Sequence, residues 1–175
     1  MMNAVSGRDR SPAVTGPPSV VLSWAEISGI CGTIAVQVTA DGVPDVIVCL
    51  IRGGMVPGVL LSHVLGCRDL RGVSLTHTCA DGINAAKTSH PVLFNPASAG
   101  DVRGRDVLLV DDVAGTGETA LAAVTMIRNH GATRTRIAVC AVNTRNWNPA
   151  APGPDECLDY IGGRYRGWVV FPWEQ

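Results

Sequence analysis

The chain has 175 residues, and at roughly 150 residues per domain this length predicts a single domain. Hydrophobic residues make up 46% of the chain and charged residues 17%. The charged share lies below the ~25% of average globular chains, which excludes intrinsic disorder for the body of the chain. The formal net charge of -1, from 14 basic and 15 acidic residues, argues against a nucleic-acid binder held by bulk positive charge.

The N-terminal segment and the cysteines bear on where the protein works. Residues 1–19 carry Arg, Ser, Gly and three prolines without the apolar segment of a signal peptide, so we expect a mobile arm before a single domain over 20–175. No apolar run approaches the ~20 residues of a membrane-spanning helix. The cysteines lack the spacing of a CxxC or zinc motif, and we expect buried free thiols in a cytoplasmic protein. They are Cys31, Cys49, Cys67, Cys79, Cys140 and Cys157.

The hydrophobic pattern predicts alternating helices and strands. Strands are expected at residues 45–51, 71–78, 106–110 and 134–142, and helices at 24–39, 58–65 and 118–131. Ser23 and Glu26 form a capping box at the start of the first helix, and Gly66 is expected to terminate the second. Such alternation predicts an α/β fold with a parallel sheet flanked by helices, whose ligands bind beyond the carboxyl ends of the strands.

Two further segments lack a strong pattern. Residues 79–104 contain Gly, Asn, Ser and Pro without sustained periodicity, and a connection of this length is uncommon unless it is functional or mobile. We expect it to act as a lid. The tail from residue 143 onward is rich in Pro and Gly, with short extended pieces at 158–161 and 168–171.

The segment at 107–120, VLLVDDVAGTGETA, carries the strongest chemical signal in the chain. A buried strand ends in Asp111 and Asp112, and small and hydroxyl residues then open a helix. Close backbone approach, hydroxyl donors and a helix N-terminus together form a cradle for an anion such as phosphate. The two carboxylates can accept hydrogen bonds from sugar hydroxyls or hold Mg²⁺. An isolated DD or GTG would be better explained as a strand end and a turn, but the whole run favours phosphate next to ribose.

This run closely resembles the phosphoribosyl pyrophosphate (PRPP) signature of type I phosphoribosyltransferases. Residues 46–66, VIVCLIRGGMVPGVLLSHVLG, resemble the pyrophosphate loop of the bacterial xanthine-guanine and hypoxanthine branch. Residues 167–174, GWVVFPWE, resemble the segment that closes over the purine in that branch. The resemblance covers about 22–174 and implies a type I fold with a small C-terminal hood over the base. It also implies a homodimer or a homotetramer.

The resemblance implies a role for each matching position. Asp111 and Asp112 would be catalytic, and Mg²⁺ would be held by Asp111, Asp112 and Glu174. PRPP would be bound by Arg52, Gly53, Gly54, Asp111, Asp112, Val113, Ala114, Gly115, Thr116, Gly117, Glu118 and Thr119. The base would be bound by Gly115, Asn143, Arg145, Trp168 and Val169. His77, Lys87 and His90 are candidates for pyrophosphate contacts, although surface solubility is the more common role for each such residue taken singly.

Two positions depart from the family pattern. The 6-oxopurine enzymes carry an aspartate that manages the proton at N7 of the base where this chain has Gly115, and a lysine that reads O6 where it has Asn143. We therefore favour a 7-substituted 7-deazaguanine as the base, as in enzymes of 7-deazapurine nucleoside biosynthesis, because Gly115 would leave room for the substituent. The alternatives are a salvage enzyme for guanine, xanthine, hypoxanthine or adenine, and a PRPP-sensing regulator that has lost catalysis.

Overall fold

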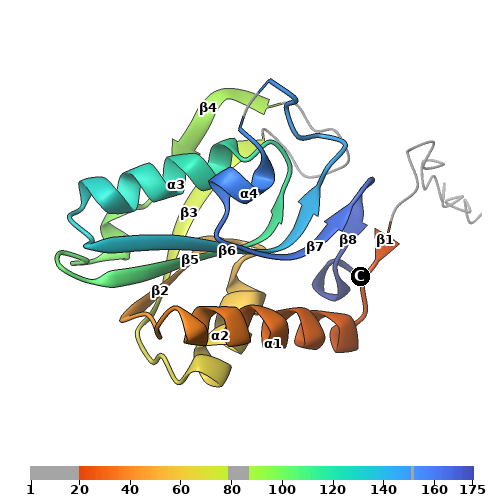
Figure 1. Ribbon diagram of the computed structural model, residues 1–175. Helices are drawn as coiled ribbons and strands as arrows, with labels where there is room; N and C mark the ends of the chain where they lie inside the picture. The colour runs from red at the N-terminus through yellow and green to blue at the C-terminus, as the bar shows by residue number, and fades with distance from the viewer. Residues whose placement is uncertain (1–19, 79–86, 151) are drawn as a thin grey trace, which may run out of the picture.

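A computed structural model describes residues 20–78, 87–150 and 152–175. A six-stranded sheet forms its centre, in the order β4-β3-β2-β5-β6-β7 (Figure 1). In chain order these strands are β2 (Val46–Ile51), β3 (Leu70–Thr78), β4 (Lys87–Leu93), β5 (Asp106–Ala114), β6 (Arg134–Asn143) and β7 (Tyr160–Tyr165). All of them pair in parallel except β4, which is antiparallel to β3 at the edge. The expected α/β fold is therefore confirmed.

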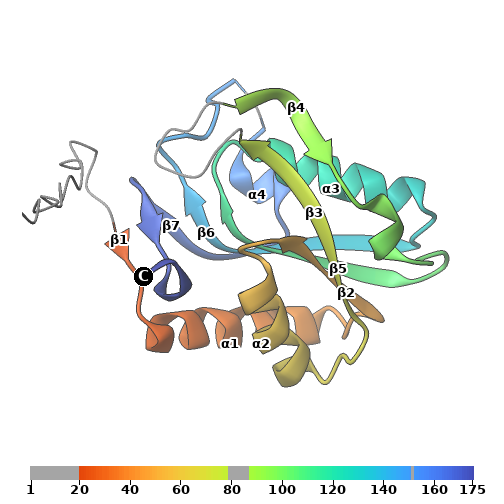
Figure 2. The same ribbon diagram turned by 180° about the vertical axis from the view of Figure 1, so that it is seen from behind.

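Helices cover both faces of the sheet. Helices α1 (Trp24–Ala40) and α2 (Met55–Leu65) lie on one face, and α3 (Glu118–Asn129) lies on the other (Figures 1 and 2). The capping box forms as expected, because the Ser23 N–H donates to Glu26 Oε2 at 2.7 Å and the Glu26 N–H donates to Ser23 Oγ at 3.3 Å. Gly66 ends α2 in the left-handed conformation, which is the role expected of it.

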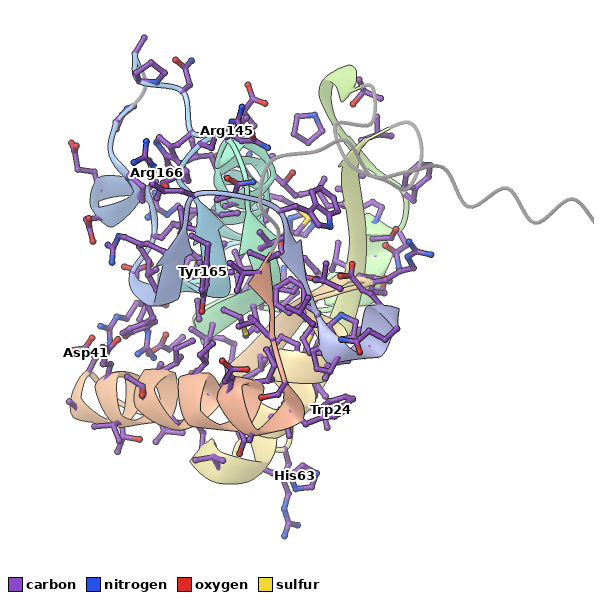
Figure 3. The ribbon with its side chains drawn as sticks, turned by 90° about the vertical axis from the view of Figure 1, so that its right-hand side faces the viewer. Trp24, Asp41, His63, Arg145, Tyr165 and Arg166 are labelled. Carbon is purple, nitrogen blue, oxygen red and sulfur yellow. The ribbon has the colours of Figure 1, made fainter. Side chains whose placement is uncertain are left out.

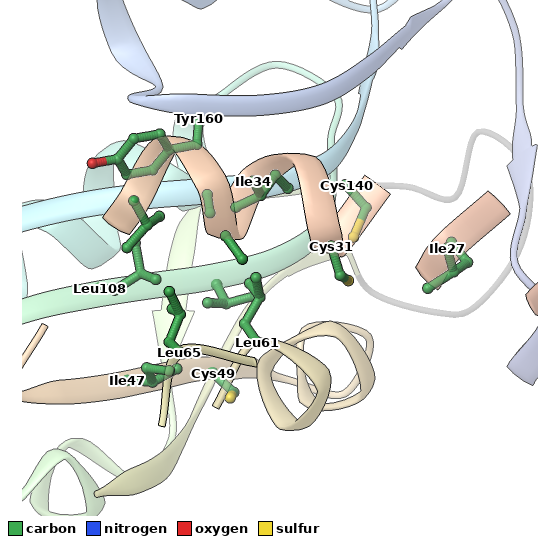
Figure 4. Close-up of a cluster of buried hydrophobic side chains, with 14 of the residues drawn as sticks. Ile27, Cys31, Ile34, Ile47, Cys49, Leu61, Leu65, Leu108, Cys140 and Tyr160 are labelled. Atoms are coloured by element: carbon green, nitrogen blue, oxygen red, sulfur yellow. The ribbon is translucent and has the colours of Figure 1, made fainter. Parts of the chain in front are cut away.

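The continuous apolar strands follow from these two layers. Side chains alternate between the faces of a strand, so in β2 Ile47 and Cys49 pack with α1 and α2, whereas Val46 and Val48 pack with α3. Figure 4 shows the first of these clusters. All four side chains are fully buried. Replacing Ile47, the largest of the four, with alanine would lower the free energy of unfolding by on the order of 2–4 kcal/mol.

Two segments of the fold were not predicted correctly from the sequence. The expected loop at 79–104 contains β4 and a short 3₁₀ helix, η1 (Pro96–Ala99), while residues 79–86 lie outside the described part of the chain. Polar residues and Pro91 concealed β4, because an edge strand pairs on one side only and tolerates both. Strand β5 also continues for four residues past the expected end at Val110.

A second, small sheet joins the two ends of the chain. Strand β1 (Val20–Val21) pairs in parallel with β8 (Val169–Val170), and the Val20 N–H donates to the Trp168 carbonyl at 2.8 Å. Short helices α4 (Pro154–Cys157) and η2 (Pro172–Glu174) complete the described structure. The segment expected to form the hood is thus held by Val20 and Val21. Residues 1–19, which were expected to form a mobile arm, lie outside the described part of the chain.

The cysteine prediction holds for most of the described positions. Cys31, Cys49, Cys67 and Cys140 are buried and free, and Cys157 is free but only partly buried. Cys79 lies outside the described residues. Within the described ranges, none of the helices combines the length and the apolar character needed to cross a membrane.

Candidate active site

The acid pair lies near the carboxyl end of β5, inside the strand and directly after its expected end at Val110. Asp111 Oδ1 accepts a hydrogen bond from the Asp112 N–H at 3.0 Å, and Asp112 Oδ1 accepts one from the Val113 N–H at 2.7 Å. Both residues are largely enclosed by protein and only partly exposed to solvent. Each carboxylate is therefore held by a backbone N–H next to it.

The glycines of the expected pyrophosphate loop pack directly against this acid pair. A Cβ on Gly53 would lie 1.8 Å from Asp112 Oδ2, and a Cβ on Gly54 would lie 2.3 Å from the carbonyl oxygen of Val110. Only glycine allows the two chain segments to come this close. The preceding peptide bond, between Ile51 and Arg52, is cis. The structure thus brings together two of the three segments on which the resemblance rested.

Burial and like charge raise the pKa values of both aspartates. Burial, followed by the negative charge of Asp112, raises the pKa of Asp111 well above its ordinary value. Burial, with a contribution from the negative charge of Glu174, raises the pKa of Asp112 to about 6. Two carboxylates that are costly to ionise would be stabilised by a nearby cation.

The turn after β5 leads into α3 as expected. Gly117 is the N-cap of α3 and has a positive φ of 82°, a conformation that favours glycine. The Thr116 hydroxyl donates to Glu118 Oε2 at 3.0 Å, and Ala114 is buried beneath the turn. Gly115 differs from these positions, because a Cβ there would meet no atom within 4 Å. Neighbouring protein atoms therefore do not require glycine at 115.

The expected base-binding residues are distributed over two segments. Asn143 ends β6 as a buried side chain, and its Oδ1 accepts a hydrogen bond from the Arg145 N–H at 3.1 Å. Its amide nitrogen donates to none of the described residues, so it remains able to bind a ligand. Arg145 is exposed and lies at the same end of the sheet as Arg166 (Figure 3). Trp168 is partly buried and precedes β8, in which Val169 is buried.

The predicted metal ligands do not form a ready-made metal site. Among the described residues, no three His, Cys, Asp or Glu side chains are grouped so that they could hold a metal ion by themselves. Glu174 Oε2 accepts a hydrogen bond from the Phe171 N–H at 2.9 Å instead, although its charge still reaches Asp112. Mg²⁺ commonly takes one or two carboxylates and completes its shell with substrate phosphates and water. The acid pair fits that arrangement, and Glu174 as a further ligand stays a prediction.

Comparison with known proteins decides the family. A model of the phosphoribosyl transferase domain matches residues 21–174, nearly the whole chain. The chain belongs to the phosphoribosyltransferase family. The resemblance seen in the sequence, including its extent, is thereby confirmed.

Similar proteins within this family act on purines. The chain is 35% identical over 74 residues to a xanthine-guanine phosphoribosyltransferase of Gluconobacter oxydans, and the matched segment spans 42% of each chain. A crystal structure of a purine phosphoribosyltransferase from Pyrococcus horikoshii is 30% identical, with a TM-score of 0.70 over 90% of this chain and 94% of that one. The Helicobacter pylori xanthine-guanine-hypoxanthine phosphoribosyltransferase, at 18% identity and a TM-score of 0.64, shares the fold over 90% of this chain and 94% of that one.

Two aromatic features of this family member were missed in the sequence. Trp147 lies against Gly117, where a Cβ would come within 2.6 Å of the indole ring. Phe171 and Trp173 stack with their ring centroids 4.7 Å apart, and Trp24 lies 5.9 Å from Trp173. No local pattern signals such contacts, because each joins residues that are far apart in the chain or in a short irregular segment. The side chains of His77, Lys87 and His90 lie outside the described ones, so their role stays a prediction.

Proposed function

We propose that this member of the family transfers the 5-phosphoribosyl group of PRPP to a purine-type base and releases pyrophosphate. The observation that carries the proposal is the contact between the two expected PRPP segments, in which Gly53 leaves just enough space for the carboxylate of Asp112. Sequence resemblance alone could not have supplied this contact. It supports a single site in which ribose and leaving group are held side by side.

The reaction exchanges one bond at C1′ of PRPP for another. The bond from C1′ to the pyrophosphate oxygen breaks, the bond to a ring nitrogen of the base forms, and that nitrogen loses its proton. Asp111 and Asp112 would hold a Mg²⁺ bound together with PRPP, and this ion would neutralise charge on the departing pyrophosphate. Residues 115–119 would bind the 5-phosphate through backbone N–H groups at the start of α3. Catalysis would then come chiefly from positioning and charge stabilisation.

The similar proteins support an ordinary purine as the base, so salvage is the form of the proposal that we favour. Asn143 lies at the end of β6 with an amide nitrogen that can donate to O6 of a 6-oxopurine. Trp168 would stack on the ring, and Val169 would offer main-chain groups to its edge. A positioned proton-transfer group typically raises the reaction rate ~10²–10⁴-fold, and without a carboxylate at position 115 part of this increase would be lost.

A second candidate base is a 7-substituted 7-deazaguanine, and the open space around Gly115 favours it. A carbon at position 7 needs no proton partner, and a substituent there could occupy the space that a longer side chain would fill. The substitution Gly115→Asp tests this candidate, because a Cβ at this position meets no protein atom within 4 Å. The substitution should suppress turnover of a 7-substituted base at least tenfold. Unchanged or improved turnover of that base would rule out the steric argument.

Pyrophosphate release from PRPP and Mg²⁺ by the purified protein tests the proposed function. The bases to compare are guanine, hypoxanthine, xanthine, adenine, and 7-cyano- and 7-carboxy-7-deazaguanine. We expect release with one of the ordinary purines and formation of the corresponding nucleoside 5′-monophosphate. Preference for a deazapurine would support the second candidate. PRPP binding without turnover of any base would contradict the proposal and favour a PRPP sensor.

Three further expectations from the sequence remain predictions. They are a homodimer or homotetramer, a cytoplasmic location, and a lid formed by residues 79–104.

A further inference from the structure

Trp147 belongs to the loop between β6 and α4, and its ring lies against the N-cap of α3. A Cβ on Gly117 would come within 2.6, 3.1 and 3.3 Å of three carbon atoms of the indole ring. The indole N–H donates to the carbonyl of Pro152 at 3.0 Å, and the Cys157 thiol donates to the same carbonyl at 3.8 Å. The ring is therefore fixed at both its edges, on one side by its own loop and on the other by Gly117.

This contact falls at a sensitive place in the proposed site. Gly117 has a positive φ of 82° and is the residue from which α3 begins, directly after Thr116. An uncovered glycine samples many conformations, and ordering it when a ligand binds costs free energy. A ring packed on Gly117 restricts these conformations before the ligand arrives, and preorganisation of this kind increases affinity.

The main alternative is that the Trp147 ring only fills space in the hydrophobic core. Two observations show that core packing does not account for all of its contacts. Trp147 packs against the buried cluster under α3 but stays partly exposed. In the sequence, Trp147 comes shortly after Asn143 and Arg145. The Trp147 ring therefore touches the turn expected to bind phosphate, and its residue lies two positions after Arg145 in the chain.

We propose that Trp147 is a positioning residue for PRPP: its ring holds Gly117, and with it the turn at the start of α3, in the conformation that receives the 5-phosphate. This inference rests on the proposed function. A residue that preorganises the free protein stabilises ground state and transition state equally, so its loss should raise the KM for PRPP and leave kcat unchanged.

The test compares Trp147→Ala, Trp147→Phe and the control Trp24→Ala, which removes an exposed tryptophan on α1. We expect Trp147→Ala to raise the KM for PRPP roughly tenfold with kcat within about twofold of wild type. Trp147→Phe keeps a ring on Gly117 and should restore most of the affinity. Trp24→Ala should change neither constant. An unchanged KM in Trp147→Ala, or a fall in kcat alone, would overturn the proposal.

A binding measurement keeps the test decisive if Trp147→Ala does not fold. Ribose 5-phosphate carries the 5-phosphate but has no leaving group, so it reports on the turn without turnover. Its addition should change the tryptophan fluorescence of wild type and of Trp24→Phe but not of Trp147→Phe. An equal change in Trp147→Phe would overturn the proposal. Wild-type protein that binds neither PRPP nor ribose 5-phosphate would instead contradict the proposed function itself.

Discussion

At the scale of single residues, two glycines of the candidate site have opposite reasons to be glycine. Gly53 is required by packing, since any side chain there would occupy the position of the Asp112 carboxylate. Gly115 is surrounded by open space, so its identity must be explained by the ligand or by chance rather than by the fold. Both were singled out from the sequence as site residues, but only the structure separates their roles.

Gly53→Ala should therefore disable the site with little change in the rest of the fold. The new Cβ would push Asp112 away from its position, and a displacement of about 1 Å at a reacting group can cost ~10²-fold in rate. We expect kcat/KM to fall by roughly that factor. Gly29→Ala is the matched control, because a Cβ on this helical glycine meets nothing within 4 Å. Equal activity of Gly53→Ala and Gly29→Ala would contradict the packing of the loop on the acid pair.

The raised pKa of Asp112 predicts a pH dependence of stability. Its pKa of about 6 in the fold exceeds the value of 3.8 for an unperturbed side chain, so between these values the folded state binds more protons than the unfolded state. This group therefore makes the free energy of unfolding fall as the pH rises from about 4 to 6.

Asp112→Asn removes the free-energy cost of ionising this carboxyl group in the folded protein. Without bound ligand, we expect this variant to be more stable than wild type at pH 7.5 by about 1–2 kcal/mol, with the difference shrinking towards pH 4. Urea unfolding at both pH values measures it. A variant that is less stable at pH 7.5, or a difference that does not change with pH, would contradict the assigned electrostatics.

At the scale of elements, β6 and β7 are joined by a buried charged group far from the candidate site. Arg136 lies on β6 with a side chain only 3% exposed, and its guanidinium donates to Asp106 at 2.8 Å and to the Tyr160 hydroxyl at 2.9 Å. The Tyr160 hydroxyl donates in turn to Asp41 Oδ2 at 2.8 Å. This network fixes α1, β5, β6 and β7 relative to one another.

Arg136→Ala should consequently destabilise the fold by about 3 kcal/mol, because it removes the donor shared by Asp106, Tyr160 and Gly42 and leaves Asp106 with the longer ion pair to Arg134, at 3.6 Å. Arg103→Ala is the control. Its ion pair with Asp101 has side-chain exposures of 78% and 67%, and such pairs contribute less than about 1 kcal/mol. Urea unfolding of both variants measures the contrast. Similar losses in the two variants would show that the Arg136 network is not a structural anchor.

The success of sequence-based prediction also varied by element. Strands buried on both faces, such as β2 and β6, were found because a continuous apolar run of strand length is typical of a parallel sheet covered by helices on both sides. Strand β4 was missed because an edge strand can be polar, and the pairing of β1 with β8 was missed because two residues carry no periodicity. The acid pair was found from local pattern, whereas the contact of Trp147 with Gly117 joins residues thirty positions apart and leaves no local signal.

At the scale of the whole molecule, the site depends on the order of strands in the sheet. Strands β2 and β5 are neighbours although α2, β3 and β4 separate them in the chain. Their parallel pairing sets the end of β2, with Gly53 and Gly54, beside the end of β5, with Asp111 and Asp112. A parallel sheet places all such ends at one edge, so the fold alone determines that the two segments meet.

The most direct test of this site is calorimetric titration of PRPP, with Mg²⁺ present, into wild-type protein and into the double variant Asp111→Asn with Asp112→Asn. We predict binding to wild type and a loss of at least tenfold in affinity in the double variant, which should remain folded because each asparagine keeps the backbone hydrogen bonds. Unchanged PRPP affinity in a folded double variant would contradict the assignment of this site.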